Sequence, residues 1–145
     1  MKLQDQVIKD LERMEGFIPH YYEDHLGFAT IGIGRLIDKR RGGGISKKEA
    51  YYLLENDISR VSKELTINLS PWFSSAPEGV KRALINMCFQ MGINGVLSFK
   101  NTLMLLRQGR YHEAADNALK SKWARQTPSR AQEVTNWIRN SQEEI

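Results

Sequence analysis

The chain has 145 residues, of which 41% are hydrophobic and 26% are charged, and this predicts one globular domain with a buried core. The single cysteine, Cys88, excludes an intrachain disulfide, and we expect it to be a small buried hydrophobe. No apolar run reaches the length of a membrane span, and the polar start argues against a signal peptide. We therefore expect synthesis in the cytoplasm and no stable membrane insertion.

The basic residues are unevenly distributed along the chain. The whole chain has a net charge of +4. Residues 100–139 contain eight Lys/Arg and three Asp/Glu, a local net charge of +5. Such a surface favours polyanionic partners, which include nucleic acid, anionic membranes and acidic cell-wall polymers. An ordinary solvated helical surface explains the same excess equally well.

The N-terminal third predicts a helix followed by a β-hairpin. Apolar residues recur at the spacing of one helical face: Leu3, Val7, Ile8, Leu11 and Met14. Gly16 is expected to stop this helix directly after Glu15. Residues 17–22 and 28–33 are typical of two short strands joined by a turn. Glu15 is therefore expected at a helix end and Asp24 in the hairpin turn, where the two carboxylates can face each other across a cleft.

A long helix is predicted after the hairpin. Residues 38–44 combine charges with three glycines and indicate a solvated loop. Ser46 and Glu49 then have the spacing of a capping box, in which each side chain bonds the backbone N–H of the other residue. We expect a helix from here to about residue 65.

The remaining residues predict several further helices. Pro77 suits the first turn of a helix, and Gly92 and Gly95 are expected to end that helix. Thr127 is expected to cap the last helix, with Pro128 at its first position. Two short helices are expected between them, and residues 140–145 are expected to fray. The predicted fold class is α+β and mostly helical. It comprises a small lobe (15–45), a linking helix (46–65) and a helical lobe (66–145).

Three blocks of sequence carry a resemblance to a known family. The first is Glu15-Gly16, then Asp24, then Thr30-Ile31-Gly32-Ile33-Gly34; the second covers residues 83–92, and the third covers residues 113–131. The chain resembles the phage-type lysozymes, most closely those of the T-even bacteriophages. The resemblance implies a single two-lobed lysozyme domain (1–145) whose N-terminal helix (1–14) packs on the helical lobe.

Glycoside hydrolysis commonly uses two carboxyl groups, one protonated and one ionised. We assign Glu15 as the general acid, because a helix C-terminus and partial burial both disfavour its charged form. Asp24, in a polar turn, is expected to stay ionised. The spacing along the chain leaves inversion and retention both open, since the carboxylate separation decides between them. The resemblance implies inversion, with Asp24 and Thr30 holding the attacking water.

The resemblance also implies roles for residues outside the first block. Arg130 matches the arginine that pairs with the catalytic glutamate from the other lobe. Four further positions match contacts to the saccharide: Leu36, Phe89, Thr102 and Asn117. The pattern around Phe89 is equally typical of a core residue.

The implied activity is cleavage of the β-1,4 bond between N-acetylmuramic acid and N-acetylglucosamine in peptidoglycan, leading to bacterial lysis. An endolysin of this kind, made in the host cytoplasm, reaches the wall only after a pore-forming phage protein opens the membrane. We expect a monomer with no cofactor. We also expect no metal, because His20, His25 and His112 form no recognisable ligand pattern, although His20 and His25 can bracket a weak site. The alternative is a non-catalytic protein that binds cell wall or nucleic acid; the chain shows no convincing recognition helix for DNA.

Overall fold

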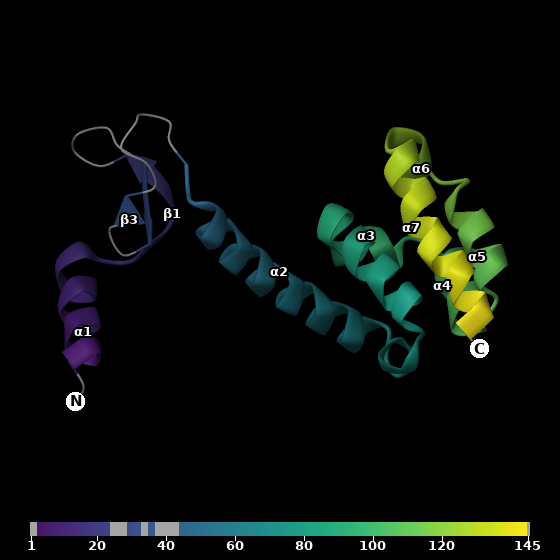
Figure 1. Ribbon diagram of the computed structural model, residues 1–145, viewed down its shortest axis with the longest axis horizontal. Coiled ribbons are helices and arrows are strands. Elements are labelled where there is room, and N and C mark those ends of the chain that lie inside the picture. The colour runs from purple at the N-terminus through teal and green to yellow at the C-terminus, as the bar shows by residue number, and fades with distance from the viewer. Residues whose placement is uncertain (1–2, 24–28, 33–34, 37–43, 145) are drawn as a thin grey trace. The chain divides into compact units, whose positions relative to one another are not determined.

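The computed structural model describes residues 3–23, 29–32, 35–36 and 44–144. Within these ranges the chain forms seven α-helices, two short 3₁₀ helices and one three-stranded antiparallel sheet (Figure 1). This mostly helical content with a small sheet confirms the predicted α+β class. The chain divides into two compact units, residues 1–52 and residues 53–145.

Helix α1 (Leu3–Glu15) opens the first unit and ends where the sequence predicts. Gly16 follows it at φ +76°, and the Gly16 N–H donates to the Glu12 carbonyl at 2.8 Å. Glycine is favoured here because it lacks the Cβ that strains other residues at positive φ. Among the described residues of the first unit, none buries the apolar face of α1. Four side chains of this face are at least 43% exposed: Val7, Ile8, Leu11 and Met14. Packing of this helix on the helical lobe stays a prediction.

The sheet of the first unit has the order β1-β2-β3. Strands β1 (Ile18–Glu23) and β2 (Ala29–Gly32) form the predicted hairpin, with Tyr22 paired to Thr30. Strand β3 (Arg35–Leu36) pairs with β2 on its other side. The sequence did not predict β3, because two residues are too few to show an alternating pattern. Residues 24–27 of the predicted turn (23–27) and residues 38–43 of the predicted loop (38–44) lie outside the described residues.

Helix α2 (Lys47–Asn68) begins with the predicted capping box. The Ser46 N–H donates to Glu49 Oε1 at 3.0 Å, and the Glu49 N–H donates to Ser46 Oγ at 3.2 Å. These two bonds satisfy backbone groups that have no partner inside the helix. The boundary between the two units, after residue 52, falls within this helix.

The second unit contains the remaining helices. In chain order they are η1 (Trp72–Ser75), α3 (Glu78–Leu97), α4 (Lys100–Arg107), α5 (Tyr111–Ala118), α6 (Lys122–Gln126), α7 (Pro128–Asn140) and η2 (Ser141–Glu144). Helix α7 packs against α3, α5 and α6, and α4 packs against α5 (Figure 1). The largest fully buried side chains of the core include Leu65, Leu84, Met87, Val134 and Ile138. The helical content of this unit agrees with the sequence prediction.

Helix α3 carries two features that the sequence indicated. The chain breaks its helical geometry at Gly92, where φ is +79°, but it resumes helical turns and continues to Leu97, so Gly95 does not end it. Cys88 is 2% exposed in the core, as predicted for a small hydrophobe. Burial raises the pKa of the Cys88 thiol, the charge of Glu64 raises it further, and Arg60 opposes both.

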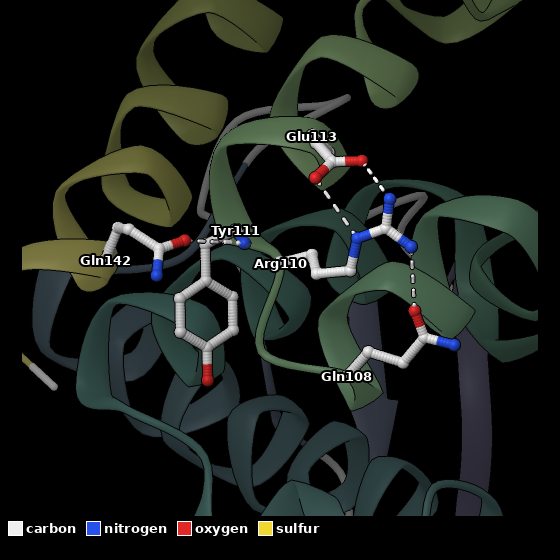
Figure 2. A network of polar contacts seen from close by, with 5 residues as sticks. All are labelled: Gln108, Arg110, Tyr111, Glu113 and Gln142. Carbon is white, nitrogen blue, oxygen red and sulfur yellow. Dashed lines mark hydrogen bonds and ion pairs between the residues drawn. The ribbon is translucent and has the colours of Figure 1, made fainter.

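The C-terminal residues contradict the prediction that they fray. Ser141 is fully buried, and its hydroxyl donates to the Trp137 carbonyl at 2.9 Å. A Cβ at Gly79 would collide with the Ser141 hydroxyl, so α3 approaches this turn closely. The Gln142 side chain accepts from the Tyr111 N–H at 2.9 Å and caps the start of α5 (Figure 2). Tertiary packing therefore orders a segment whose local sequence is polar.

Candidate active site

Glu15 is the last residue of α1, directly before the left-handed Gly16. The first unit leaves its side chain exposed, so the expected partial burial is absent within this unit. The carbonyl groups at the helix C-terminus still place partial negative charge near the Glu15 carboxyl group. The fold thus presents this carboxyl group at the junction of α1 and the sheet, since β1 begins three residues later.

Thr30 lies at the centre of the three-stranded sheet. Its backbone pairs with Tyr22 of β1 and Leu36 of β3, and its side chain is 4% exposed. A residue paired on both sides has little backbone freedom, so the sheet fixes the backbone position from which the Thr30 side chain projects. Leu36 is placed beside Thr30 by the backbone pairing, and its side chain lies outside the described residues. Asp24 follows β1 directly in the sequence and also lies outside them.

Thr102 and Asn117 are brought together in the second unit. The Thr102 hydroxyl, on α4, donates to Asn117 Oδ1, on α5, at 2.7 Å. Both residues line a groove of about 880 Å³. The two predicted saccharide contacts are 15 residues apart in sequence, and the packing of α4 on α5 makes them one polar pair.

Aromatic and amide side chains complete this groove. The Trp123 indole N–H donates to Gln90 Oε1 at 2.9 Å, and the Phe99 ring lies edge-on to Trp123 with ring centres 6.0 Å apart. The groove therefore combines apolar walls with a few fixed polar groups, as ligand sites in proteins commonly do. Sequence reasoning did not assign Gln90, Phe99 or Trp123 a role, although all three lie close in sequence to predicted contacts.

Phe89 and Arg130 line a different pocket of the second unit, of about 690 Å³. The second unit leaves Phe89 47% exposed, so it is not part of the core. Arg130 is held by Asn86, because its Nε donates to the Asn86 side-chain oxygen at 2.9 Å and its Nη2 to the Asn86 carbonyl at 3.3 Å. Phe89 therefore lines a different pocket from the pair formed by Thr102 and Asn117. Pairing of Arg130 with Glu15 stays a prediction.

Within the described part of the chain, no cluster of three or more His, Cys, Asp or Glu side chains has the arrangement of a metal site. No helix among these residues has the length and apolarity needed to cross a membrane.

Comparison with known proteins matches these features to one family. The sequence model of the family described as phage lysozyme matches residues 12–143. A probable T4-type lysozyme 1 of Dictyostelium discoideum is 34% identical, over 90% of this chain and 92% of that protein. A probable T4-type lysozyme 2 of the same organism is 32% identical, over 88% of this chain and 90% of that protein.

A third relative is the pre-baseplate central spike protein Gp5 of Enterobacteria phage T4. It is 30% identical over 86% of this chain, which spans only 26% of that longer protein. The α+β fold and the matches over most of the chain define a lysozyme, an enzyme of the glycoside hydrolase class. The chain belongs to the phage lysozyme family, and this membership implies peptidoglycan as the substrate.

Proposed function

We propose that this chain is an endolysin-type lysozyme that cleaves the β-1,4 bond between N-acetylmuramic acid and N-acetylglucosamine, with Glu15 as the general acid. The observation that carries the proposal is the arrangement of the first unit. It presents an exposed carboxyl group at the end of α1 and a buried threonine on the central strand β2. Glu15 and Thr30 are spaced along the sequence from Asp24 as in the motif that resembles the phage-type lysozymes.

The proposed reaction is a single displacement. Glu15 donates its proton to the glycosidic oxygen as the bond to the anomeric carbon breaks. A water held by Asp24 and the Thr30 hydroxyl attacks the anomeric carbon from the opposite face, and Asp24 accepts the proton of this water. The sugar product therefore has the inverted anomeric configuration. From the helical lobe, Arg130 stabilises the carboxylate that Glu15 becomes when it donates its proton. Four side chains hold the glycan strand: Leu36, Phe89, Thr102 and Asn117.

The test replaces Glu15 by Gln, which keeps the size of the side chain and removes the acidic proton. Clearing of permeabilised Gram-negative cells should fall by several orders of magnitude. The matched control is Glu12→Gln, which alters an exposed glutamate one turn earlier on α1 and should clear at the wild-type rate. Equal clearing by Glu15→Gln and the wild type would exclude Glu15 as the acid. A wild type that does not clear cells would favour the non-catalytic binder.

Product stereochemistry tests the mechanism separately. NMR of the first products formed from a glycan strand should show the α-anomer, because the bond that is cleaved is β. Initial β-anomer would establish retention and would assign Asp24 a nucleophilic role instead.

The proposed biological role is lysis of a bacterial host after a phage pore-forming protein opens the membrane, and the enzyme acts as a monomer. Cells expressing the chain in their cytoplasm should stay intact until a membrane-permeabilising agent is added, and should then lyse rapidly. Lysis without that agent would contradict the need for a pore-forming partner. Sedimentation equilibrium should return the mass of one chain, 16.7 kDa.

A further inference from the structure

The guanidinium group of Arg130 is held along one of its edges by a single neutral residue. Arg130 lies in the first turn of α7, and its partner Asn86 lies on α3. Arg130 Nε donates to the Asn86 side-chain oxygen at 2.9 Å, and Nη2 donates to the Asn86 carbonyl at 3.3 Å. Because both donors belong to the same edge of a planar group, the two bonds together fix its position and its rotation.

The two helices that carry this contact are anchored in the core of the second unit. Asn86 directly precedes Met87, and Arg130 directly precedes Ala131, and both of these neighbours are buried. Helices α3 and α7 also pack against each other. The backbone at both ends of the contact therefore has little freedom to move, and the orientation of Arg130 is set before any ligand arrives.

The other edge of the Arg130 guanidinium is open. The group has five N–H donors in a flat fork, and Asn86 takes two of them. In the part of the chain that the structure describes, neither Nη1 N–H of Arg130 donates to a partner. One Nη1 N–H and the second Nη2 N–H run parallel, which is the geometry that binds both oxygens of a carboxylate. Arg130 therefore presents a complete edge for a carboxylate ligand.

Asn86 orients the charge of Arg130 without neutralising it. The Asn86 amide is uncharged, and among the described residues no carboxylate lies within 4.0 Å of the Arg130 guanidinium. The pocket that both residues line contains one acidic residue, Glu78, and two further cations, Lys81 and Arg82. The positive charge of Arg130 thus remains available to a carboxylate from outside the second unit.

We propose that Asn86 is a positioning residue of the hydrolytic reaction, which holds the open edge of Arg130 ready for the Glu15 carboxylate. The proposal rests on the proposed function, because there Arg130 stabilises the carboxylate that Glu15 becomes when it donates its proton. That negative charge develops as the glycosidic bond breaks and is absent while the substrate is merely bound. Loss of the orientation should therefore lower kcat and leave KM unchanged.

The expected loss is moderate, because the guanidinium stays in the protein when Asn86 is removed. A displacement of about 1 Å in an active site can cost about a hundredfold in rate, and a side chain that still samples the productive orientation should lose less. We expect the kcat of Asn86→Ala to fall about tenfold. Arg130→Ala removes the charge altogether and should lose more. In the Arg130→Ala background, Asn86→Ala should cause no further loss, because Asn86 acts only through Arg130.

The kinetic test compares the wild type, Asn86→Ala, Arg130→Ala and the double variant on soluble glycan strands, well below their melting temperatures. The control for lost stability is Gln142→Ala, because Gln142 bonds the start of α5 and does not line the pocket of Arg130. This control should melt earlier than the wild type and keep its kcat. A contact that serves only the stability of the fold would leave kcat unchanged in Asn86→Ala as well.

Asn86→Asp separates stability from activity. The aspartate keeps the acceptor for Arg130 and adds a negative charge, and hydrogen bonds between two charged groups are stronger than those with a neutral acceptor. This variant should melt no earlier than the wild type. Its kcat should still fall, because the aspartate neutralises the charge that Arg130 otherwise offers to Glu15. A wild-type kcat in Asn86→Asp would overturn the proposal.

NMR of the Arg130 Nε–H group measures the orientation directly, without hydrolysis. This proton should exchange slowly with water in the wild type and in Asn86→Asp, where it is hydrogen-bonded, and rapidly in Asn86→Ala. Equal exchange rates in the wild type and Asn86→Ala would show that Asn86 does not hold Arg130.

The kinetic outcomes distinguish this proposal from the proposed function. If Arg130→Ala is impaired and Asn86→Ala is not, the positioning role is overturned and the role of Arg130 stands. An equal loss from Asn86→Ala with and without Arg130 also overturns the positioning role, since Asn86 would then act independently. If Arg130→Ala keeps the wild-type kcat, or the wild type hydrolyses nothing, the proposed function itself fails and the positioning role falls with it.

Discussion

The Thr102 hydroxyl donates to the Asn117 side-chain oxygen at 2.7 Å, and this bond links α4 to α5 inside the groove of the second unit. Thr102 is 2% exposed, so its hydroxyl is positioned by packing as well as by the bond. Because the Asn117 oxygen is the group that accepts this bond, the NH₂ group of Asn117 remains as a donor for a ligand. One buried hydroxyl therefore orients the amide that we expect to contact the saccharide.

Thr102→Val should impair both stability and substrate binding. Valine keeps the shape of threonine but leaves the Asn117 oxygen without its donor, which should lower the free energy of unfolding by about 1 kcal/mol. Because the Asn117 amide loses its orientation, KM for glycan strands should also rise. Urea unfolding and steady-state kinetics measure the two effects. Thr66→Val is the control, because the exposed Thr66 hydroxyl bonds only the backbone of its own helix, and it should leave KM unchanged. An unchanged KM in Thr102→Val would remove the proposed role of this pair.

Arg130 and Asn86 should show energetic coupling in a double-mutant cycle. Two hydrogen bonds join them, across 44 residues of sequence. Each single change to Ala should destabilise the protein by about 1–3 kcal/mol, because the bonds involve a charged group. The destabilisation of the double variant should be smaller, by about 1 kcal/mol, than the sum of the destabilisations of the two single variants. Chemical denaturation of the four proteins gives the coupling energy, and strictly additive effects would show that the contact contributes nothing to stability.

Gln142 should stabilise the start of α5 from the end of the chain. Figure 2 shows its side chain reaching the Tyr111 backbone, beside the contacts of Arg110 with Glu113 and Gln108. Gln142→Ala removes this cap and should lower the free energy of unfolding by about 1 kcal/mol. Gln132→Ala, at an exposed position of α7, is the matched control and should change stability by less than about 0.5 kcal/mol. Thermal unfolding compares the two, and equal melting temperatures would contradict the cap.

Cys88 should make stability depend on pH in the alkaline range. Burial raises the pKa of its thiol, so the folded state keeps the proton at pH values where the unfolded state, with a thiol pKa of about 8.5, has lost it. The resulting stabilisation is fully present below the unfolded pKa and is lost as the pH rises through the folded pKa. The difference in stability between the wild type and Cys88→Ala should therefore be constant below about pH 8 and shrink above about pH 9.

Thiol labelling provides the second measurement for Cys88. A thiolate-directed reagent should label the native protein slowly and the urea-unfolded protein rapidly at the same alkaline pH, because the native thiol is both buried and protonated. Equal rates in the two states would contradict the burial and the direction of the pKa change.

Local interactions explain why part of this fold was predictable. The capping box of Ser46 and Glu49 joins residues three apart, and the end of α1 at Gly16 depends on one backbone angle. Thr127 shows the limit of such reasoning. It begins α7 before Pro128 as predicted, but its hydroxyl donates to the Trp123 carbonyl instead of capping α7. Thr127 also ends α6, a helix that the sequence did not predict, and this places a carbonyl acceptor within reach of its hydroxyl.

The sequence by itself determined the fold class, the capped start of α2, the stop of α1 and, through its spaced motifs, the lysozyme family. Only the tertiary structure decided that Thr102 meets Asn117, that Phe89 lies in a different pocket, and that the Gln142 side chain caps α5. The physical reason is separation along the chain. Bonds between residues a few positions apart are set by local geometry, whereas contacts between distant residues depend on how the helices pack.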